Sequence, residues 1–147
     1  MKDLIHHILD VAKMKKVDYA DIRVVRWQNE EIGVKNGKVD ALIHDSDLGF
    51  GIRVLFRGAW GFACSSKMTK AEMEAVFRKA LKIAKASSKA KGNDLFFPSR
   101  GPVVDQYQTP IAIDPFHVST EAKLALLLKA DEIIRRNKKV KISEAFM

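Results

Sequence analysis

The sequence predicts an α+β domain: a helix, a largely antiparallel β-meander of about five strands, and helices that cover one face of that sheet. Three observations predict this class. Apolar residues recur at helical spacing within residues 4–12, 73–84 and 124–134, and they alternate with polar residues between Tyr19 and Ser66. Short polar turn signals divide the alternating region. At 147 residues, the chain is long enough to bury a core as one domain.

The first predicted element is a helix that Asp3 caps and that ends near Lys15 and Lys16. One apolar stripe runs along it at helical spacing. The stripe consists of Leu4, Ile5, Ile8, Leu9 and Ala12.

The meander begins at Tyr19, and its apolar residues are spaced two apart. The first three predicted strands carry Ile22 and Val24, then Ile32 and Val34, then Val39, Ala41 and Ile43. The Asn36-Gly37 pair indicates a two-residue type I′ hairpin turn between the second and third strands. Residues 45–47, an Asp-Ser-Asp run, predict a further turn that leads into the next hairpin.

That hairpin, from Gly49 to Ser66, holds half of the eight glycines among large apolar side chains. With Arg57-Gly58 as its loop, the large residues Phe56, Val54 and Ile52 face Ala59, Gly61 and Ala63. The other face groups Leu55, Arg53, Trp60 and Phe62. Glycine in a strand often marks a close approach by another backbone, which comes either from a helix of the same domain or from a partner chain. Arg53, Trp60 and Phe62 are therefore the predicted subunit or peptide contact.

A capping box of Thr69 and Glu72 begins the second helix, which is expected to run to about Ala86. Its buried stripe is predicted to be Met73, Val76, Phe77, Ala80, Leu81 and Ala84. Residues 92–118 predict an extended loop, which Leu95, Phe96 and Phe97 anchor. Ser119 caps the third helix, expected over residues 120–136 with an apolar side of Leu124, Leu127, Leu128 and Ile134.

The final residues alternate again and predict a strand from residue 139 without a downstream partner, which indicates a fragment of a longer chain or a shared sheet edge. We therefore expect a single domain over residues 1–147. Its predicted parts are a helix–sheet–helix core (1–91), an extended loop (92–118), and a helix with a terminal strand (119–147).

The net charge of +8 suggests an acidic partner such as nucleic acid. However, the lysines and arginines are spread along every helix, opposite the apolar stripes, as solvated helix faces would be. The single Cys64 excludes an internal disulfide and a cysteine cluster for zinc, and suits a reducing compartment. The N-terminus resembles neither a signal peptide nor a membrane span. We therefore expect a cytoplasmic protein.

No set of residues predicts catalysis or metal binding within this chain. His6 and His7 are adjacent, so on a helix they point about 100° apart and cannot chelate one ion together. His44 beside Asp45 and Asp47 could bind a divalent cation, although a polar turn is the simpler interpretation. Neither a phosphate-binding loop nor a complete dinucleotide-binding glycine motif is present.

Several motifs occur in an order that resembles a known family. They are Tyr-Ala-Asp-Ile-Arg at 19–23, Asn-Gly-Lys-Val at 36–39, Gly-Ala-Trp-Gly-Phe-Ala at 58–63, and Ala-Leu-Lys-Ile-Ala-Lys-Ala at 80–86. A later segment, residues 113–128, continues the pattern. The chain resembles the N-terminal domain of the TldD/PmbA family, whose members are known as proposed modulators of DNA gyrase.

The resemblance implies a zinc metallopeptidase assembly in which unfolded peptides enter a chamber between subunits. The family's zinc-binding His-Glu-x-x-x-His motif lies in a C-terminal domain. This sequence contains no such motif, since none of its histidines is immediately followed by a glutamate. The implied role is an N-terminal assembly and substrate-enclosing domain that is not catalytic on its own. The implied partners are a homologous subunit and an unfolded peptide, rather than nucleic acid or a membrane. The alternative is a basic nucleic-acid-binding or gyrase-regulating module.

Overall fold

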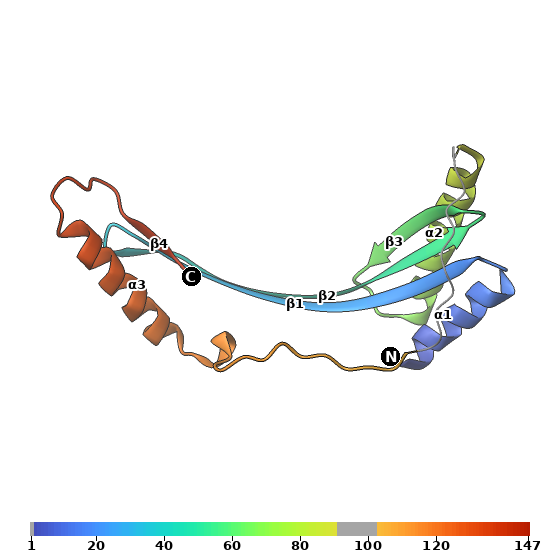
Figure 1. Cartoon of the computed structure of the whole chain (residues 1–147), viewed down its shortest axis with the longest axis horizontal. Helices are drawn as coiled ribbons and strands as arrows, with labels where there is room; N and C mark the ends of the chain where they lie inside the picture. Colours follow the sequence, from blue (N-terminus) through green and yellow to red (C-terminus); the bar gives the residue numbers. More distant parts are fainter. Residues whose placement is uncertain (1, 91–102) are drawn as a thin grey trace. The chain divides into compact units, whose positions relative to one another are not determined.

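The computed structural model describes residues 2–90 and 103–147 of the protein (Figure 1). The described residues form an α+β fold, as predicted. The elements are α1 (Lys2–Met14), β1 (Tyr19–Lys35), β2 (Lys38–Phe56), β3 (Ala59–Ser65), α2 (Lys70–Ala90), the 3₁₀ helix η1 (Pro115–His117), α3 (Thr120–Arg135) and β4 (Glu144–Phe146). The strands make one sheet in the order β3-β2-β1-β4.

The described residues contain four strands rather than about five, because β1 and β2 are longer than predicted. β1 has 17 residues and β2 has 19. The polar residues Asp45–Asp47 lie within β2 and do not form the expected turn. They are exposed, and no residue between Lys38 and Phe56 has the positive φ that a tight hairpin turn would need. Polarity here marks a solvated segment of a strand that lies beside β1 in the sheet.

The chain divides into two compact units, and β1 and β2 contribute to both. The first unit contains residues 2–27 and 47–90 among those described. Its core lies between one face of the sheet and the helices α1 and α2. All six residues of the predicted α2 stripe are buried, together with Ile8 and Ala12 of α1. From the strands, the same core receives Phe50, Ile52, Val54 and Ala63.

The glycine-rich hairpin has the predicted turn and register. Arg57 and Gly58 both have positive φ, at 48° and 70°, as a type I′ turn requires. Phe56, Val54 and Ile52 pair with Ala59, Gly61 and Ala63. Gly61 explains why small residues are needed on β3: a Cβ there would lie 2.0 Å from the carbonyl oxygen of Ala80. The backbone of α2 therefore packs directly on this strand.

The second unit contains Gln28–Ser46 and Val103–Met147. Asn36 and Gly37 form the predicted turn, again with two positive φ values (49° and 79°). Ile32 and Val34 of β1 pack against Leu127 of α3. Leu124, Leu128 and Ala145 pack around these three buried residues.

Buried polar groups complete the second unit. The prediction that Ile134 lies on the buried side of α3 is wrong, because its side chain is 43% exposed. Asp131 is fully buried instead; it accepts a hydrogen bond from Ser143 Oγ at 2.5 Å and lies 3.0 Å from Arg135 Nε. The spacing of apolar residues in α3 does not predict the burial of Asp131, because one of its two polar partners, Ser143, lies outside the helix.

The terminal strand is shorter than predicted and is paired. β4 runs antiparallel to β1, with Gly33, Val34 and Lys35 opposite Phe146, Ala145 and Glu144. The terminal strand is therefore not unpaired: its partner, β1, lies upstream in the chain. The ring of Phe146 lies against Gly33, where a Cβ would be 3.1 Å from Cε1.

The hydroxyl caps predicted at the start of α2 and α3 are present, but the capping box of α2 is incomplete, because the Thr69 amide donates to the Lys67 carbonyl rather than to Glu72. Thr69 Oγ1 accepts a hydrogen bond from the Glu72 amide, and Ser119 Oγ accepts one from the Ala122 amide, each at 3.3 Å. The predicted anchor at residues 95–97 lies outside the described residues. No helix among residues 2–90 and 103–147 is long and apolar enough to cross a membrane.

Candidate contact face on the open side of the sheet

In the first unit, the strands present a second face that α1 and α2 do not cover. Side chains alternate between the two faces of a strand, so the neighbours of the core residues point to the open side. A groove of about 550 Å³ lies on this face. Its lining comes from β1 (Asp21, Arg23, Val25, Trp27), β2 (Asp47, Gly49, Phe50, Gly51, Arg53) and the hairpin end (Phe62, Cys64, Ser65, Ser66).

Two glycines of the middle strand leave the groove without side chains along part of its floor. A Cβ on Gly51 would lie 2.7 Å from Cε2 of Phe62, so the Phe62 ring occupies the space beside this glycine. A Cβ on Gly49 would meet only the Ser65 carbonyl oxygen, at 3.4 Å. The backbone of β2 is therefore open to the groove at Gly49, whereas the Phe62 ring covers it at Gly51.

The walls of the groove are apolar and exposed. Val25, Trp27 and Phe62 have 57%, 53% and 54% of their surface exposed. Large apolar side chains that line a concave surface are typical of sites that take an apolar group. The groove is therefore suited to an extended chain segment with apolar side chains.

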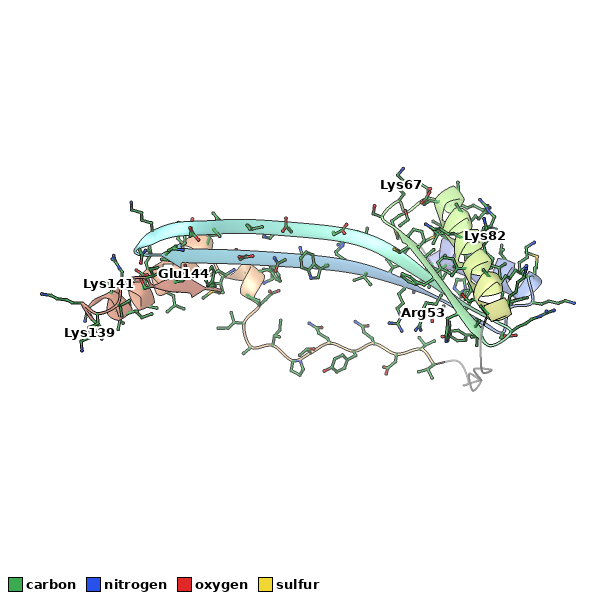
Figure 2. The ribbon with its side chains drawn as sticks, turned by 90° about the horizontal axis from the view of Figure 1, so that it is seen from above. Arg53, Lys67, Lys82, Lys139, Lys141 and Glu144 are labelled. Carbon is green, nitrogen blue, oxygen red and sulfur yellow. The ribbon has the colours of Figure 1, made fainter. Side chains whose placement is uncertain are left out.

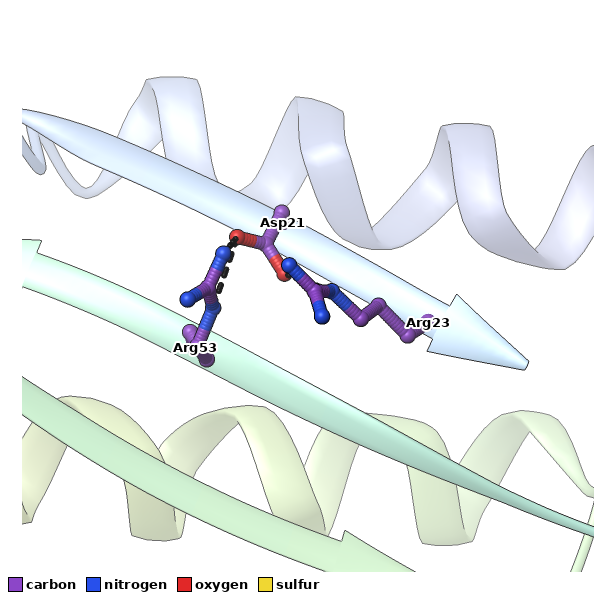
Figure 3. Close-up of polar contacts among 3 residues, drawn as sticks. All are labelled: Asp21, Arg23 and Arg53. Atoms are coloured by element: carbon purple, nitrogen blue, oxygen red, sulfur yellow. Dashed lines mark hydrogen bonds and ion pairs between the residues drawn. The ribbon is translucent and has the colours of Figure 1, made fainter. Parts of the chain in front are cut away.

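One end of the groove carries an ion-pair cluster of three residues (Figure 3). Arg53 donates two hydrogen bonds to Asp21 Oδ2, from Nε at 2.9 Å and from Nη2 at 2.5 Å. Arg23 Nε lies 3.8 Å from Asp21 Oδ1, beyond hydrogen-bonding distance. The hydrogen bond to Asp21 raises the pKa of Arg53. Burial, and then the charge of Asp21, raise the pKa of Tyr19.

The structure brings together the three residues predicted from the hairpin. Arg53 pairs with Phe62 across the β2–β3 ladder, and both line the groove. Trp60 does not line it; the Arg53 guanidinium lies 5.3 Å from the Trp60 ring centroid. Tyr19 contacts the same indole edge-on, with centroids 5.8 Å apart. Trp60 therefore positions Arg53 rather than forming the groove surface.

Sequence reasoning missed the contribution of β1, namely Asp21, Arg23 and Val25. The signal available was the period of two from Tyr19 onward, which places these residues with Trp27 on one face. That signal becomes useful only once β1 is known to lie beside β2. The opposed charges of Asp21 and Arg53 are consistent with that arrangement.

The described residues do not fit a zinc site. Residues 2–90 and 103–147 contain no group of three or more His, Cys, Asp or Glu side chains placed to hold a metal ion. The ring of His44 instead meets Phe116 edge-on, with centroids 6.3 Å apart. Zinc sites require at least three such ligands from the protein. No step of zinc chemistry is therefore assigned to this chain.

The basic residues lie mainly on helix surfaces, as predicted. On α2, Arg78, Lys82, Lys85 and Lys89 line one surface pocket with Leu81 and Ala86. Figure 2 shows Lys82 on this helix. Lys85 and Arg57 both lie over the ring of Phe56, at 5.3 and 5.4 Å. The Phe56 ring is half-buried and already contacts these two cations, so it does not offer a free platform on which a base could stack.

Comparison with known proteins identifies the class of protein to which this fold belongs. Residues 20–84 match the first domain of the PmbA/TldA metallopeptidase family. The chain is 29% identical over 125 residues to a metalloprotease from Methanocaldococcus jannaschii, covering 82% of this chain and 28% of that protein. It is 33% identical over 116 residues to a metalloprotease from Methanothermobacter thermautotrophicus, covering 78% and 24%. The chain spans about a quarter of the length of these relatives.

Solved structures share the fold. A proposed modulator of a DNA gyrase from Thermotoga maritima matches with a TM-score of 0.72 and 16% identity, covering 99% of this chain and 34% of its own. TldE from Thermococcus kodakarensis matches with a TM-score of 0.68 and 17% identity, covering 97% and 32%. These two structures share the fold of this chain over nearly its whole length. The chain belongs to the TldD/PmbA family and corresponds to its N-terminal domain.

Proposed function

We propose that this chain is the assembly and substrate-enclosing domain of a TldD/PmbA-like metallopeptidase that cleaves unfolded peptides, and that it has no catalytic activity on its own. The match of residues 20–84 to the family's first domain carries this proposal. The sequence supplies no His-Glu-x-x-x-His motif, so zinc and the cleavage step belong to a different domain. The proposed partners are a homologous subunit and an unfolded peptide, in the cytoplasm.

The open groove supports an enclosing role. Its apolar walls, and the space left above Gly49, offer contact to an extended chain without requiring one particular side chain. Phe62 and Arg53 contribute side chains of the types that are enriched in protein interfaces. A contact surface of this kind would bind a partner or a peptide but would not hydrolyse it.

The first experiment measures peptide cleavage. The 147-residue chain is incubated with a fluorogenic unfolded peptide, with and without a metal chelator. We expect no chelator-sensitive cleavage by the chain alone. Chelator-sensitive cleavage that persists after repurification would overturn the proposal that the chain is not catalytic.

The second measurement is association with a full-length family member that bears the His-Glu-x-x-x-His motif. We expect a stable complex in analytical ultracentrifugation, and about a tenfold weaker one with Phe62→Ala, because exposed aromatic anchors contribute strongly to interfaces. Leu42→Ala is the matched control, since Leu42 is similarly exposed, at 58%, on β2 in the second unit. No complex, or an equal effect of both variants, would contradict the proposed contact.

The alternative function, nucleic-acid binding or gyrase regulation, is favoured by the net charge of +8. It predicts an affinity for duplex DNA whose logarithm falls linearly with the logarithm of salt concentration, by about 0.9 per neutralised phosphate. We expect no such binding in fluorescence anisotropy at low ionic strength. A salt-dependent shift would make this alternative the better account.

A further inference from the structure

Residues 103–111, called the arm below, form an exposed extended segment in the second unit (Figure 1). The arm contains neither helix nor strand, and every residue in it is exposed. Its large apolar side chains are Val103, Val104, Tyr107 and Ile111. Several large apolar side chains exposed within one short segment typically mark an interaction surface.

The arm has one apolar side that also carries a negative charge. In an extended chain, alternate side chains point to the same side. The odd-numbered residues are Val103, Asp105, Tyr107, Thr109 and Ile111. The even-numbered residues are Val104, Gln106, Gln108 and Pro110. The odd side therefore combines three large apolar side chains with the only charged group of the arm, the carboxylate of Asp105.

The open groove of the first unit complements this side in both shape and charge. Its walls, Val25, Trp27 and Phe62, are apolar, and Gly49 leaves room for a chain to lie across β2. Arg23 supplies the charge. Its side chain is 70% exposed, and within the described residues its nearest carboxylate oxygen is 3.8 Å away, so its hydrogen-bond donors are available.

We propose that the groove binds the arm of a second copy of this chain, with Asp105 against Arg23 and with Val103 and Tyr107 against the apolar walls. The inference rests on the proposed assembly role, which requires a partner subunit. Each copy has both a groove and an arm, so two copies related by a two-fold axis would exchange arms reciprocally and close as a symmetric dimer. The Asp21–Arg53 pair stays intact and leaves Arg23 to the incoming carboxylate.

The single cysteine allows a direct test, because Cys64 lines the groove and is exposed. Val103→Cys and Val104→Cys place a second thiol on opposite sides of the arm at adjacent positions. Under mild oxidation, we expect Val103→Cys to form an intermolecular disulfide with Cys64 at least about tenfold faster than Val104→Cys. The linked residues are identified by peptide mass mapping. Equal rates, or a bond formed only within one chain, would overturn the proposal.

A double-mutant cycle tests the charge pair independently. Arg23→Ala and Asp105→Asn should each weaken the dimer about tenfold in sedimentation equilibrium, and the double variant should be no weaker than either single one. Asp105→Asn keeps the oxygen that accepts a hydrogen bond from the Gln106 amide, so the local turn is preserved. Arg26→Ala on the same strand is the control and should change nothing. Additive effects, or an equal loss with Arg26→Ala, would refute the pairing.

These results are distinguishable from a failure of the proposed function. A chain that binds a full-length family member but shows no selective Cys64 linkage would retain the assembly role and exclude arm exchange between copies. A chain that forms the linked dimer but binds no family member would support arm exchange between copies and contradict the proposed assembly with a full-length family member. A monomeric chain in both experiments excludes both.

Discussion

At the residue scale, two glycines in neighbouring strands have opposite reasons for being glycine. Gly61 faces α2, where the helix backbone leaves no room for a Cβ. Gly49 faces the open groove, where a Cβ would make ordinary contacts. The first glycine is required by packing inside the unit, whereas the second leaves space for something outside it. Substitution to alanine separates these two roles.

We expect Gly61→Ala to lower the free energy of unfolding by about 3 kcal/mol, because α2 must shift to accept the methyl group. The added Cβ would lie 2.0 Å from the Ala80 oxygen and 2.5 Å from the Ala84 nitrogen, both backbone atoms. Gly49→Ala is the control and should be neutral or slightly stabilising. Urea denaturation followed by circular dichroism measures both. Equal stability of the two variants would contradict the packing argument.

Tyr19 gives a pH-dependent prediction at the same scale. Its pKa is raised from 10.0, first by burial and then by the charge of Asp21. A raised pKa in the folded state contributes stability below the unfolded pKa, and this contribution is lost as the pH rises through the folded pKa. In Tyr107→Phe, which leaves Tyr19 as the single tyrosine, tyrosinate absorbance should therefore appear at higher pH in the folded chain than in the urea-unfolded chain.

Adding Asp21→Asn to that background should move the folded midpoint downward, since a negative charge near the phenol is removed. A folded midpoint at or below the unfolded one would show that Tyr19 is not buried beside Asp21. An unchanged midpoint after Asp21→Asn would assign the shift to burial alone.

At the element scale, a buried carboxylate connects α3 to the chain just before β4. Asp131 of α3 accepts a hydrogen bond from the Ser143 hydroxyl. The Ser143 amide donates to the Asn36 side chain in the β1–β2 turn, and the Asn36 amide donates to the Ser143 carbonyl. Arg135 Nη1 also donates to the Asn36 carbonyl at 3.2 Å. The helix α3, the segment before β4 and the β1–β2 turn thus meet at one polar cluster.

Ser143→Ala should lower the free energy of unfolding by about 1–3 kcal/mol, because it removes a hydrogen bond from a buried charge. Ser46→Ala, at an exposed position of β2, is the control and should change stability by less than about 0.5 kcal/mol. Denaturation in urea measures both. In an Asp131→Leu background the Ser143→Ala effect should largely disappear; an undiminished effect would mean that Ser143 acts through another contact.

At the scale of the whole molecule, the sequence predicted features that depend on local chemistry. The α2 stripe, the caps at Thr69 and Ser119, and the register around Arg57-Gly58 each follow from spacing or from turn residues close in the chain. The continuity of β2 through residues 45–47 did not follow, because a solvated strand and a turn have the same polar composition. The cluster of Asp21, Arg23 and Arg53 depends on which strands are neighbours, which no local pattern specifies.

The continuity of β1 and β2 has a consequence for how the fold is specified. β1 contributes Ile22 and Val24 to the first core, and Ile32 and Val34 to the second. A slip of one residue along β2 would turn all four side chains to the wrong face at once. Either core alone would oppose such a slip, so the alignment of the two strands is specified twice, by independent sets of side chains. A chain with this redundancy tolerates a polar, weakly specified middle segment, because the alignment is fixed on both sides of it.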